Sequence, residues 1–264
     1  GSSGWYCVYN GIKSTVNVKG LSGNTDYIFQ VFEYEDTTGY ESYNTDTGTD
    51  NPRSQATNNQ AAPNYALSFD GIDDYVDIAS GLGSLTTLTI EAWFKTTGTV
   101  QTCLVGCQGD TVGSSISGAW TPVLTLKNDG NIRAEFWTGT IGSIETTSGG
   151  YNDGEFHHVA LVGAGSEQTL YVDSELIGSR SGDIDISGMK YISLGTGYGR
   201  SFRGFPSSGW HYFDGVIDEV RFWSDVRSQS EIQANMHREL DGDEANLVTY
   251  YQMSNGNGDE LWDD

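Results

Sequence analysis

The chain of 264 residues carries 36 acidic and 13 basic residues, which gives a formal net charge of −23. This excess of negative charge repels phosphate backbones and anionic membrane surfaces, so we expect no nucleic-acid partner. Apolar residues form 36% of the chain, enough for a packed core. No apolar run approaches the ~20 residues of a membrane span, so we expect no membrane insertion. The 35 glycines and the short apolar runs between turn residues predict an all-β sandwich with little helix.

The first 50 residues alternate strand patterns with turns, most clearly at residues 27–34. Leu21 is followed six residues later by Tyr27 at the start of this strand, which is the spacing of a tyrosine corner. Residues 1–50 therefore resemble the C-terminal half of a fibronectin type III domain. Half a sandwich has no partner for its apolar face, so we expect it either to dock on a flanking domain of the same polypeptide or to be poorly ordered. Residues 51–64 are polar and hold two prolines, so we expect a linker there.

Residues 65–252 have the pattern of one closed β domain. A Phe-Asp-Gly turn introduces two similar strand patterns, at residues 69–78 and 213–223, as if the first and last strands lay side by side. The predicted strands cover residues 66–70, 74–79, 87–95, 101–106, 122–127, 131–137, 143–147, 156–162, 168–173, 175–178, 190–194 and 213–223. We expect residues 253–264 to be a linker or the start of a further repeat.

Four motifs in this span carry a family resemblance. They are ALSFDG at residues 66–71, LTIEAWF at 88–94, FHHVA at 156–160 and GVIDEVRFW at 215–223. In this order they resemble the laminin-G-like (LamG type 3), concanavalin A-like jelly rolls that occur as repeats in secreted bacterial proteins. The resemblance implies a lectin-like jelly-roll β-sandwich and a secreted or cell-surface location.

One helix and one pair of cysteines stand out. Ser228 and Glu231 have the spacing of a capping box, and apolar residues follow at helical intervals, so a helix is predicted over 229–239. Cys103 and Cys107 could form a local disulfide if the backbone turned between them, whereas an extended strand would hold them too far apart. The sequence leaves both alternatives open.

Acidic residues near the two Phe-Asp-Gly turns suggest a calcium site. Asp70 and Asp218 occupy similar positions in strands expected to be neighbours, and Ca²⁺ prefers oxygen ligands. The family resemblance adds that concanavalin A-like domains often hold one structural Ca²⁺ between the first and last strands, which here would fall on Asp70, Gly71 and Asp218. The alternative is that Asp70 and Asp214 only cap tight turns.

The connection spanning residues 195–212 is longer than most loops in compact domains, and long loops are often functional. Aromatic rings can stack on sugar C–H faces, while guanidinium groups bind hydroxyl, carboxylate or sulfate oxygens. The predicted ligand-binding residues in this loop are Tyr198, Arg200, Phe202, Arg203, Trp210 and His211, with support from Trp120, Trp137 and Tyr151. The alternative is a loop that packs its own aromatic side chains into a satellite core.

We therefore expect a non-catalytic carbohydrate-binding module, stabilised by calcium, that recognises an extracellular polysaccharide. An anionic polysaccharide is favoured if Arg200 and Arg203 face the groove. The alternative is an adhesion or structural spacer domain of a multidomain surface protein. Concanavalin A-like folds also include polysaccharide-degrading enzymes, but the Glu-x-Asp-x-x-Glu strand that commonly supplies their carboxylates is not found, so no catalytic residues are expected.

Overall fold

The structure is a computed structural model. It describes residues 66–78, 82 and 85–253 in full, and four strands in the part of the chain before residue 66. The chain divides into two compact units, residues 1–64 and 65–264.

The first unit contains two antiparallel strand pairs. Strand β1 (Asp26–Phe29) pairs with β4 (Arg53–Ala56), and β2 (Glu33–Thr37) pairs with β3 (Tyr40–Asn44). Strand β4 lies within the predicted linker of residues 51–64, and its residues pair with β1. Leu21 of the proposed tyrosine corner lies outside the described residues, and the fibronectin type III resemblance stays a prediction.

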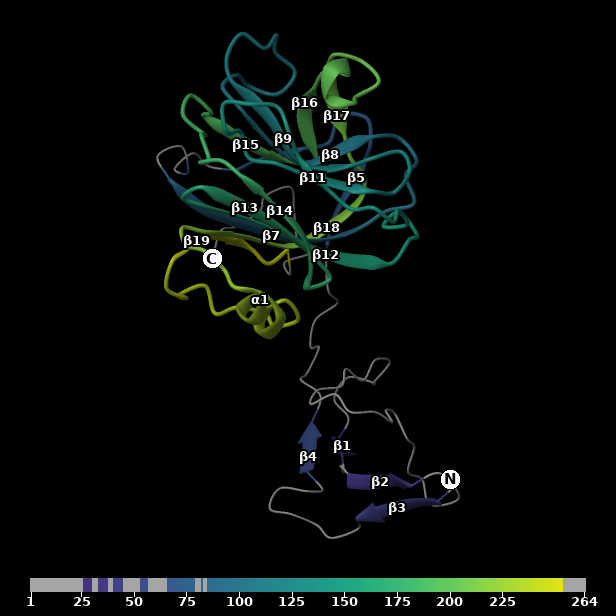
Figure 1. The fold of residues 1–264 in the computed structure, drawn as a ribbon. Coiled ribbons are helices and arrows are strands. Elements are labelled where there is room, and N and C mark those ends of the chain that lie inside the picture. Colours follow the sequence, from purple (N-terminus) through teal and green to yellow (C-terminus); the bar gives the residue numbers. More distant parts are fainter. Residues whose placement is uncertain are drawn as a thin grey trace. The chain divides into compact units, whose positions relative to one another are not determined.

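The second unit is a sandwich of two antiparallel sheets (Figure 1). Within the described residues, the larger sheet has seven strands, with β5 paired to β18 outside the main order. In spatial order they are β14 (Glu175–Ser181), β13 (Glu167–Val172), β12 (Phe156–Ala164), β7 (Thr87–Lys95), β18 (Asp214–Trp223) and β19 (Leu247–Tyr251), with β5 (Leu67–Asp70) beside β18. The six-stranded sheet has the order β11 (Ile144–Glu145), β10 (Ile132–Ala134), β9 (Trp120–Leu126), β8 (Thr102–Gln108), β15 (Tyr191–Leu194) and β6 (Val76–Ile78).

The core lies between the two sheets and follows from alternation along the strands. In β7, for example, Leu88, Ile90, Ala92 and Phe94 are all buried in the core cluster, because successive strand residues point to opposite faces. The all-β jelly-roll sandwich is confirmed, and each of the twelve predicted strands matches an observed one. Strand β19 continues the larger sheet beyond the last predicted strand.

The first and last predicted strands are neighbours, but their register differs from the expectation. Strand β5 pairs with β18 so that Asp70 lies opposite Asp214, whereas Asp218 lies opposite Trp93 of β7. Four residues along a strand separate Asp214 from Asp218, roughly 13 Å. The predicted pairing of Asp70 with Asp218 is therefore wrong, because the turns align Asp70 with Asp214. A bulge follows Asp218, where Glu219 adopts a φ of 51°.

Helix α1 (Gln229–Asn235) begins with the predicted capping box. The Ser228 side chain accepts from the Glu231 backbone, and the Glu231 side chain accepts in return. Ile232 packs on Ala160 and Val162, and Figure 1 shows α1 outside the seven-stranded sheet. The helix is shorter than predicted, because the chain leaves it after Asn235 and carries Leu240 into a separate cluster with Trp223 and Tyr250.

Cys103 and Cys107 are both buried and free. They lie in the extended strand β8, so the alternative without a disulfide is the correct one. Burial raises the pKa of the Cys107 thiol to about 12, which keeps it protonated and unreactive. No helix among the described residues is long and apolar enough to span a membrane.

Candidate functional site

The connection predicted as a long loop contains a β-hairpin. Strand β16 (Thr196–Gly199) pairs with β17 (Gly209–Tyr212). The hairpin lies on the outer face of the six-stranded sheet, because a Cβ added to Gly106 of β8 would come within 2.6 Å of the Gly197 Cα. Two glycines facing each other thus allow the hairpin backbone to pack directly on the sheet.

A short 3₁₀ helix, η2 (Ser201–Arg203), lies between the two strands of the hairpin. It ends at Gly204, whose φ of 85° is readily adopted only by glycine. Phe202 on this turn is 60% exposed, whereas Phe205 is buried with its ring centroid 4.5 Å from that of His211. Part of the connection therefore packs as a satellite core, as the alternative interpretation expected, and part of it faces solvent.

Four aromatic rings meet at the base of η2. Trp120 lies 5.4 Å from Tyr198 at 72° and 6.1 Å from Phe202 at 57°. Tyr198 in turn lies 5.7 Å from Trp210 at 78°, and the Trp210 indole donates to the Ser114 carbonyl at 3.1 Å. The rings therefore make edge-to-face or tilted contacts, and they do not form one flat platform.

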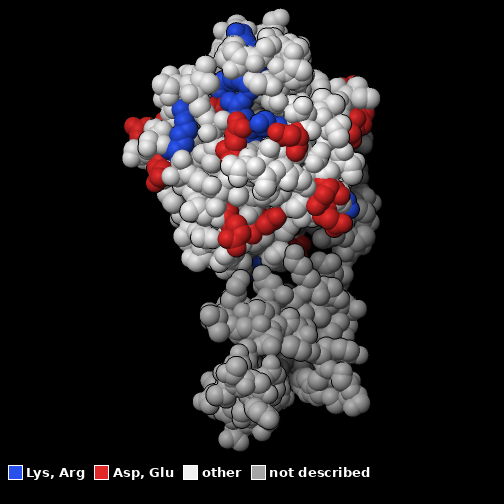
Figure 2. Space-filling view, turned by 45° about the vertical axis from the view of Figure 1, so that its right-hand side comes forward, with Lys and Arg blue, Asp and Glu red and all other residues white. Residues whose placement is uncertain are grey.

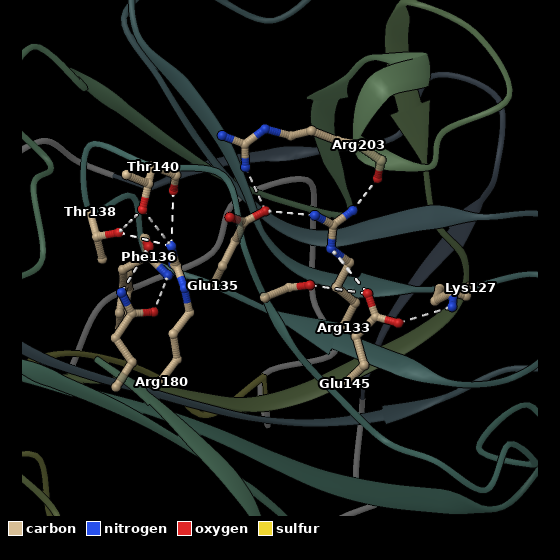
Figure 3. Close-up of polar contacts among 11 residues, drawn as sticks. Lys127, Arg133, Glu135, Phe136, Thr138, Thr140, Glu145, Arg180 and Arg203 are labelled. Atoms are coloured by element: carbon tan, nitrogen blue, oxygen red, sulfur yellow. Dashed lines mark hydrogen bonds and ion pairs between the residues drawn. The ribbon is translucent and has the colours of Figure 1, made fainter. Parts of the chain in front are cut away.

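Beneath these rings, a buried carboxylate binds two arginines (Figure 3). Arg203 Nη1 donates to Glu135 Oε1 at 2.5 Å, and Arg133 Nη2 lies 3.1 Å from the same oxygen. Arg133 also donates to the Arg203 carbonyl, so the side chain of β10 fixes the backbone of η2. Glu135 has no exposed surface, and these two partners compensate its charge.

The ion-pair network continues toward the sheet edge. Glu145 lies 3.6 Å from Arg133 Nε and 3.0 Å from Lys127 Nζ, and Asp129 lies 3.8 Å from the same Lys127 atom. The carboxylates thus match the cations along this row. Figure 2 shows basic side chains gathered in the upper part of one face of the unit, with acidic ones around them.

Arg200 occupies a different environment. Its guanidinium carbon lies 5.4 Å from the Trp120 ring and 5.7 Å from the Tyr198 ring, within the range of cation–π contacts. By contrast, Arg203 is only 4% exposed and lies over Trp120 and Trp137 at 5.1 and 5.0 Å. Arg200 therefore lies nearer to solvent, and Arg203 supports the rings from beneath.

The remaining predicted ligand residues divide between this cluster and other places. His211 Nε2 donates to the Ser207 carbonyl, 3.1 Å away, and burial lowers the pKa of His211. Tyr151 instead packs edge-on to His157 at 5.0 Å, and two aspartates hold that histidine. Trp137 joins the cluster through Arg203, so eight of the nine predicted ligand residues lie around the hairpin, and Tyr151 makes its ring contact elsewhere.

An acidic turn follows strand β5. Oxygen atoms of Asp70, Asp73 and Asp74 all lie within 4.8 Å of one another, and all three residues are exposed. Asp74 accepts from the Asp70 backbone at 2.9 Å. Gly71 has a φ of 76°, and an added Cβ there would lie 2.9 Å from the Asp214 Cβ. Three carboxylates at this spacing fit a Ca²⁺ ion, which binds oxygens at roughly 2.3–2.6 Å.

Sequence reasoning missed Arg133 and Glu135. A signal for them exists, because Ile132, Ala134 and Phe136 alternate with them and are buried in the core. The two charged residues must therefore share the outer face of the sheet. The spacing of residues in the sequence could not reveal their partner Arg203, because Arg203 lies 68 residues from Glu135.

The family resemblance is confirmed by comparison with known proteins. The Laminin_G_3 model, described as the concanavalin A-like lectin/glucanases superfamily, matches residues 70–233, and the chain belongs to this family. No curated protein matches the chain.

Several solved structures are similar to the chain at low sequence identity. A candidate carbohydrate-binding protein from Bacteroides ovatus is 17% identical with a TM-score of 0.55, and the match covers 92% of this chain and 66% of that protein. Domain 4 of the extracellular arabinanase AbnA from Geobacillus stearothermophilus, in complex with arabinotriose, is 15% identical with a TM-score of 0.47, covering 80% and 86%. Mouse laminin α1 domains LG4-5 are 17% identical with a TM-score of 0.43, covering 72% and 50%.

Proposed function

We propose that residues 65–252 form a non-catalytic carbohydrate-binding module that recognises an extracellular polysaccharide. The observation that carries this proposal is the surface of the hairpin β16–β17. There Arg200 lies against Trp120 and Tyr198, with Phe202 exposed beside them. The structural similarity to a candidate carbohydrate-binding protein is consistent with this role but shows only a shared fold.

The mechanism would combine one exposed ring with hydrogen bonding. Phe202 offers an apolar surface for the C–H face of a sugar, and Arg200 offers donors for hydroxyl or acidic oxygens. The free faces of Trp120 are limited, because both Arg200 and Arg203 lie over its ring. Polar and charged contacts should therefore outweigh stacking, and affinity for an anionic polysaccharide should fall as salt is added.

A structural calcium ion is part of this proposal, at a corrected position. Asp70, Asp73 and Asp74 would hold it, and Asp218 would not, because Asp218 lies on the far part of β18. A bound ion would offset two of the three negative charges of these carboxylates and fix the turn between β5 and β6. Gly71 would serve by letting this turn approach Asp214 closely.

The alternative is a spacer or adhesion domain in a multidomain surface protein. The edge-to-face rings and the buried Phe205 favour it, because a ring packed into the fold cannot stack on a sugar. Under the spacer alternative, Phe202 and Arg200 would be ordinary surface residues.

Affinity gel electrophoresis separates these two functions. The whole chain would be run through gels that contain neutral or acidic polysaccharides, beside a variant carrying Phe202→Ala and Arg200→Ala. We expect at least one polysaccharide to retard the chain and the variant to lose most of that retardation. If no polysaccharide in a broad panel retards the folded chain, the spacer function replaces the binding function. Release of reducing ends would instead indicate an enzyme.

A further inference from the structure

We infer that Arg200 is the residue that binds an acidic group of the glycan, a carboxylate or a sulfate, and that Arg203 holds it in place without touching the ligand. This inference rests on the proposed function. It adds the class of sugar that is bound and distinguishes the role of Arg200, which binds the ligand, from that of Arg203, which positions Arg200.

The ion pairs of the described arginines single out Arg200. Among the residues that the structure describes, the arginines with a carboxylate oxygen within 4.0 Å are Arg133, Arg203, Arg221, Arg227 and Arg238. Arg180 lacks one, but its Nη2 donates to Thr138 and Thr140 at 3.0 Å (Figure 3). Arg200 has neither a carboxylate nor a hydrogen bond for its guanidinium. Its Nε is buried without a hydrogen-bond partner, as are those of Arg133, Arg203, Arg221 and Arg227, so the missing carboxylate is what distinguishes it.

An unpaired guanidinium is informative because of the charge around it. Carboxylates are abundant in a chain of net charge −23, yet none of the described carboxylates lies within 4.0 Å of the Arg200 guanidinium. The neighbouring network of Lys127, Arg133 and Arg203 is balanced by Asp129, Glu135 and Glu145. Arg200 adds a positive charge beside this balanced network, and an anion bound there would gain from it.

The fold also fixes Arg200 before any ligand arrives. Its backbone is extended, and its carbonyl accepts from Arg203 N at 2.8 Å at the start of η2. Its guanidinium contacts two aromatic rings, which already restrict the side chain. Binding a ligand therefore costs less side-chain conformational entropy. A planar guanidinium held in this way suits the two oxygens of a carboxylate or sulfate better than the point charge of a lysine.

Arg203 cannot do the same work. It is nearly fully buried, and its Nη1 is taken by Glu135 at 2.5 Å. Its guanidinium supports Trp120, which in turn contacts Arg200. Arg203 is thus a positioning residue. Replacing Arg203 should disturb the packing of the whole face, whereas replacing Arg200 should weaken binding of the acidic group and leave the fold unchanged.

Calorimetric titration with matched oligosaccharides tests this assignment. The whole chain is titrated with an oligouronate and its carboxyl-reduced neutral form, and with a sulfated oligosaccharide and its desulfated form. The two pairs distinguish a carboxylate from a sulfate. Variants are Arg200→Gln, Arg200→Lys and Lys95→Gln, the last being a charge-matched control on the seven-stranded sheet. Thermal unfolding of each variant verifies the fold.

We expect one acidic form to bind at least about tenfold more tightly than its neutral form. Arg200→Gln should abolish that difference by weakening binding of the acidic form more than that of the neutral form, Arg200→Lys should recover only part of the difference, and Lys95→Gln should preserve it. The inference is overturned if the neutral form binds as tightly as the acidic one, or if Arg200→Gln and Lys95→Gln behave alike, although the proposed function then stands. If no oligosaccharide binds the folded chain, both fail.

Discussion

The outer faces of both sheets carry charged residues that are covered by other parts of the chain. The two faces differ in how these charges are paired. On the seven-stranded sheet, Glu91 lies 3.3 Å from His158 and both side chains are 1% exposed. Arg221 donates to the carbonyls of Asn235 and Arg238, where α1 ends and the chain turns back, and to Glu219. On this sheet, α1 and the segment after it supply hydrogen-bond acceptors for the buried Arg221 guanidinium.

On the six-stranded sheet the cover is the hairpin β16–β17, and it brings cations of its own. Arg203 is neutralised from below by Glu135, while Arg200 is left without a carboxylate. A face that satisfies its charges internally is closed to ligands, and one that retains an unpaired guanidinium beside an exposed Phe202 can bind one. The comparison therefore supports the proposal that the second face, and not the first, binds the ligand.

The largest expected effect on stability comes from removing the buried carboxylate of Glu135, which lies beneath the hairpin β16–β17. Glu135→Ala leaves Arg133 and Arg203 buried without their shared partner, so the free energy of unfolding should fall by about 3–5 kcal/mol. Urea unfolding measures it. The control is Glu145→Ala, whose side chain is 39% exposed and whose loss should cost below about 1 kcal/mol. Equal effects of the two changes would mean that the buried network does not anchor the hairpin.

Calcium should stabilise the chain through the acidic turn alone. At a free calcium concentration 100 times the dissociation constant, the expected gain is about 2.7 kcal/mol, seen as a rise in Tm over a chelated sample. Asp73→Asn combined with Asp74→Asn should remove the rise, because only one of the three clustered carboxylates remains. Asp218→Asn is the control and should retain it. A rise that survives the double change would place any calcium elsewhere.

The contact between Gly106 and Gly197 gives a purely steric test of how the hairpin β16–β17 packs on the sheet, with a smaller expected change in the free energy of unfolding. Gly106→Ala puts a Cβ at 2.6 Å from the Gly197 Cα, so the hairpin must lift and unfolding should become easier by about 1–3 kcal/mol. Gly118→Ala is a fair control, since its nearest neighbour would lie 3.6 Å away. If both variants unfold alike in urea, the hairpin does not lie tightly on the sheet.

The smallest effect concerns the opposite face. Burial and the nearby Glu219 raise the pKa of Asp218 to about 7, whereas an unfolded Asp releases its proton near pH 4. The folded state thus binds the extra proton, and stability falls as the pH rises from about 4 to about 7. Asp218→Asn should remove this slope and stabilise the chain by about 1–2 kcal/mol at pH 8, with no gain at pH 4. The exposed Asp183→Asn should leave the slope intact; an unchanged slope in Asp218→Asn would refute the assignment.

The sequence predicted the strands well because the core imposes a period of two on each of them. It failed for β16 and β17, where Gly197 and Gly199 lack the β-branched and apolar signature of a strand. Those glycines are needed for close packing on the sheet and on Phe205, a requirement that appears only in three dimensions.

The candidate site was predicted in part for a similar reason. The composition of the 195–212 segment indicated the aromatic and basic residues that the structure brings together around the hairpin, but not which arginine is paired. That depends on Glu135, which directly follows strand β10 and lies 68 residues from Arg203 in the sequence. The calcium prediction failed at Asp218 because the turn alignment, which the repeated Phe-Asp-Gly motif could have suggested, pairs Asp70 with Asp214.

The most direct test of the central claim is to map glycan binding onto the indole N–H resonances of the chain by NMR. Trp120 and Trp210 belong to the hairpin face, while Trp93 and Trp223 belong to the seven-stranded face, where the Trp93 indole donates to Met236. Titration with an acidic oligosaccharide should shift the first two resonances and leave the other two in place. Shifts confined to Trp93 and Trp223 would contradict the account and move recognition to the opposite face.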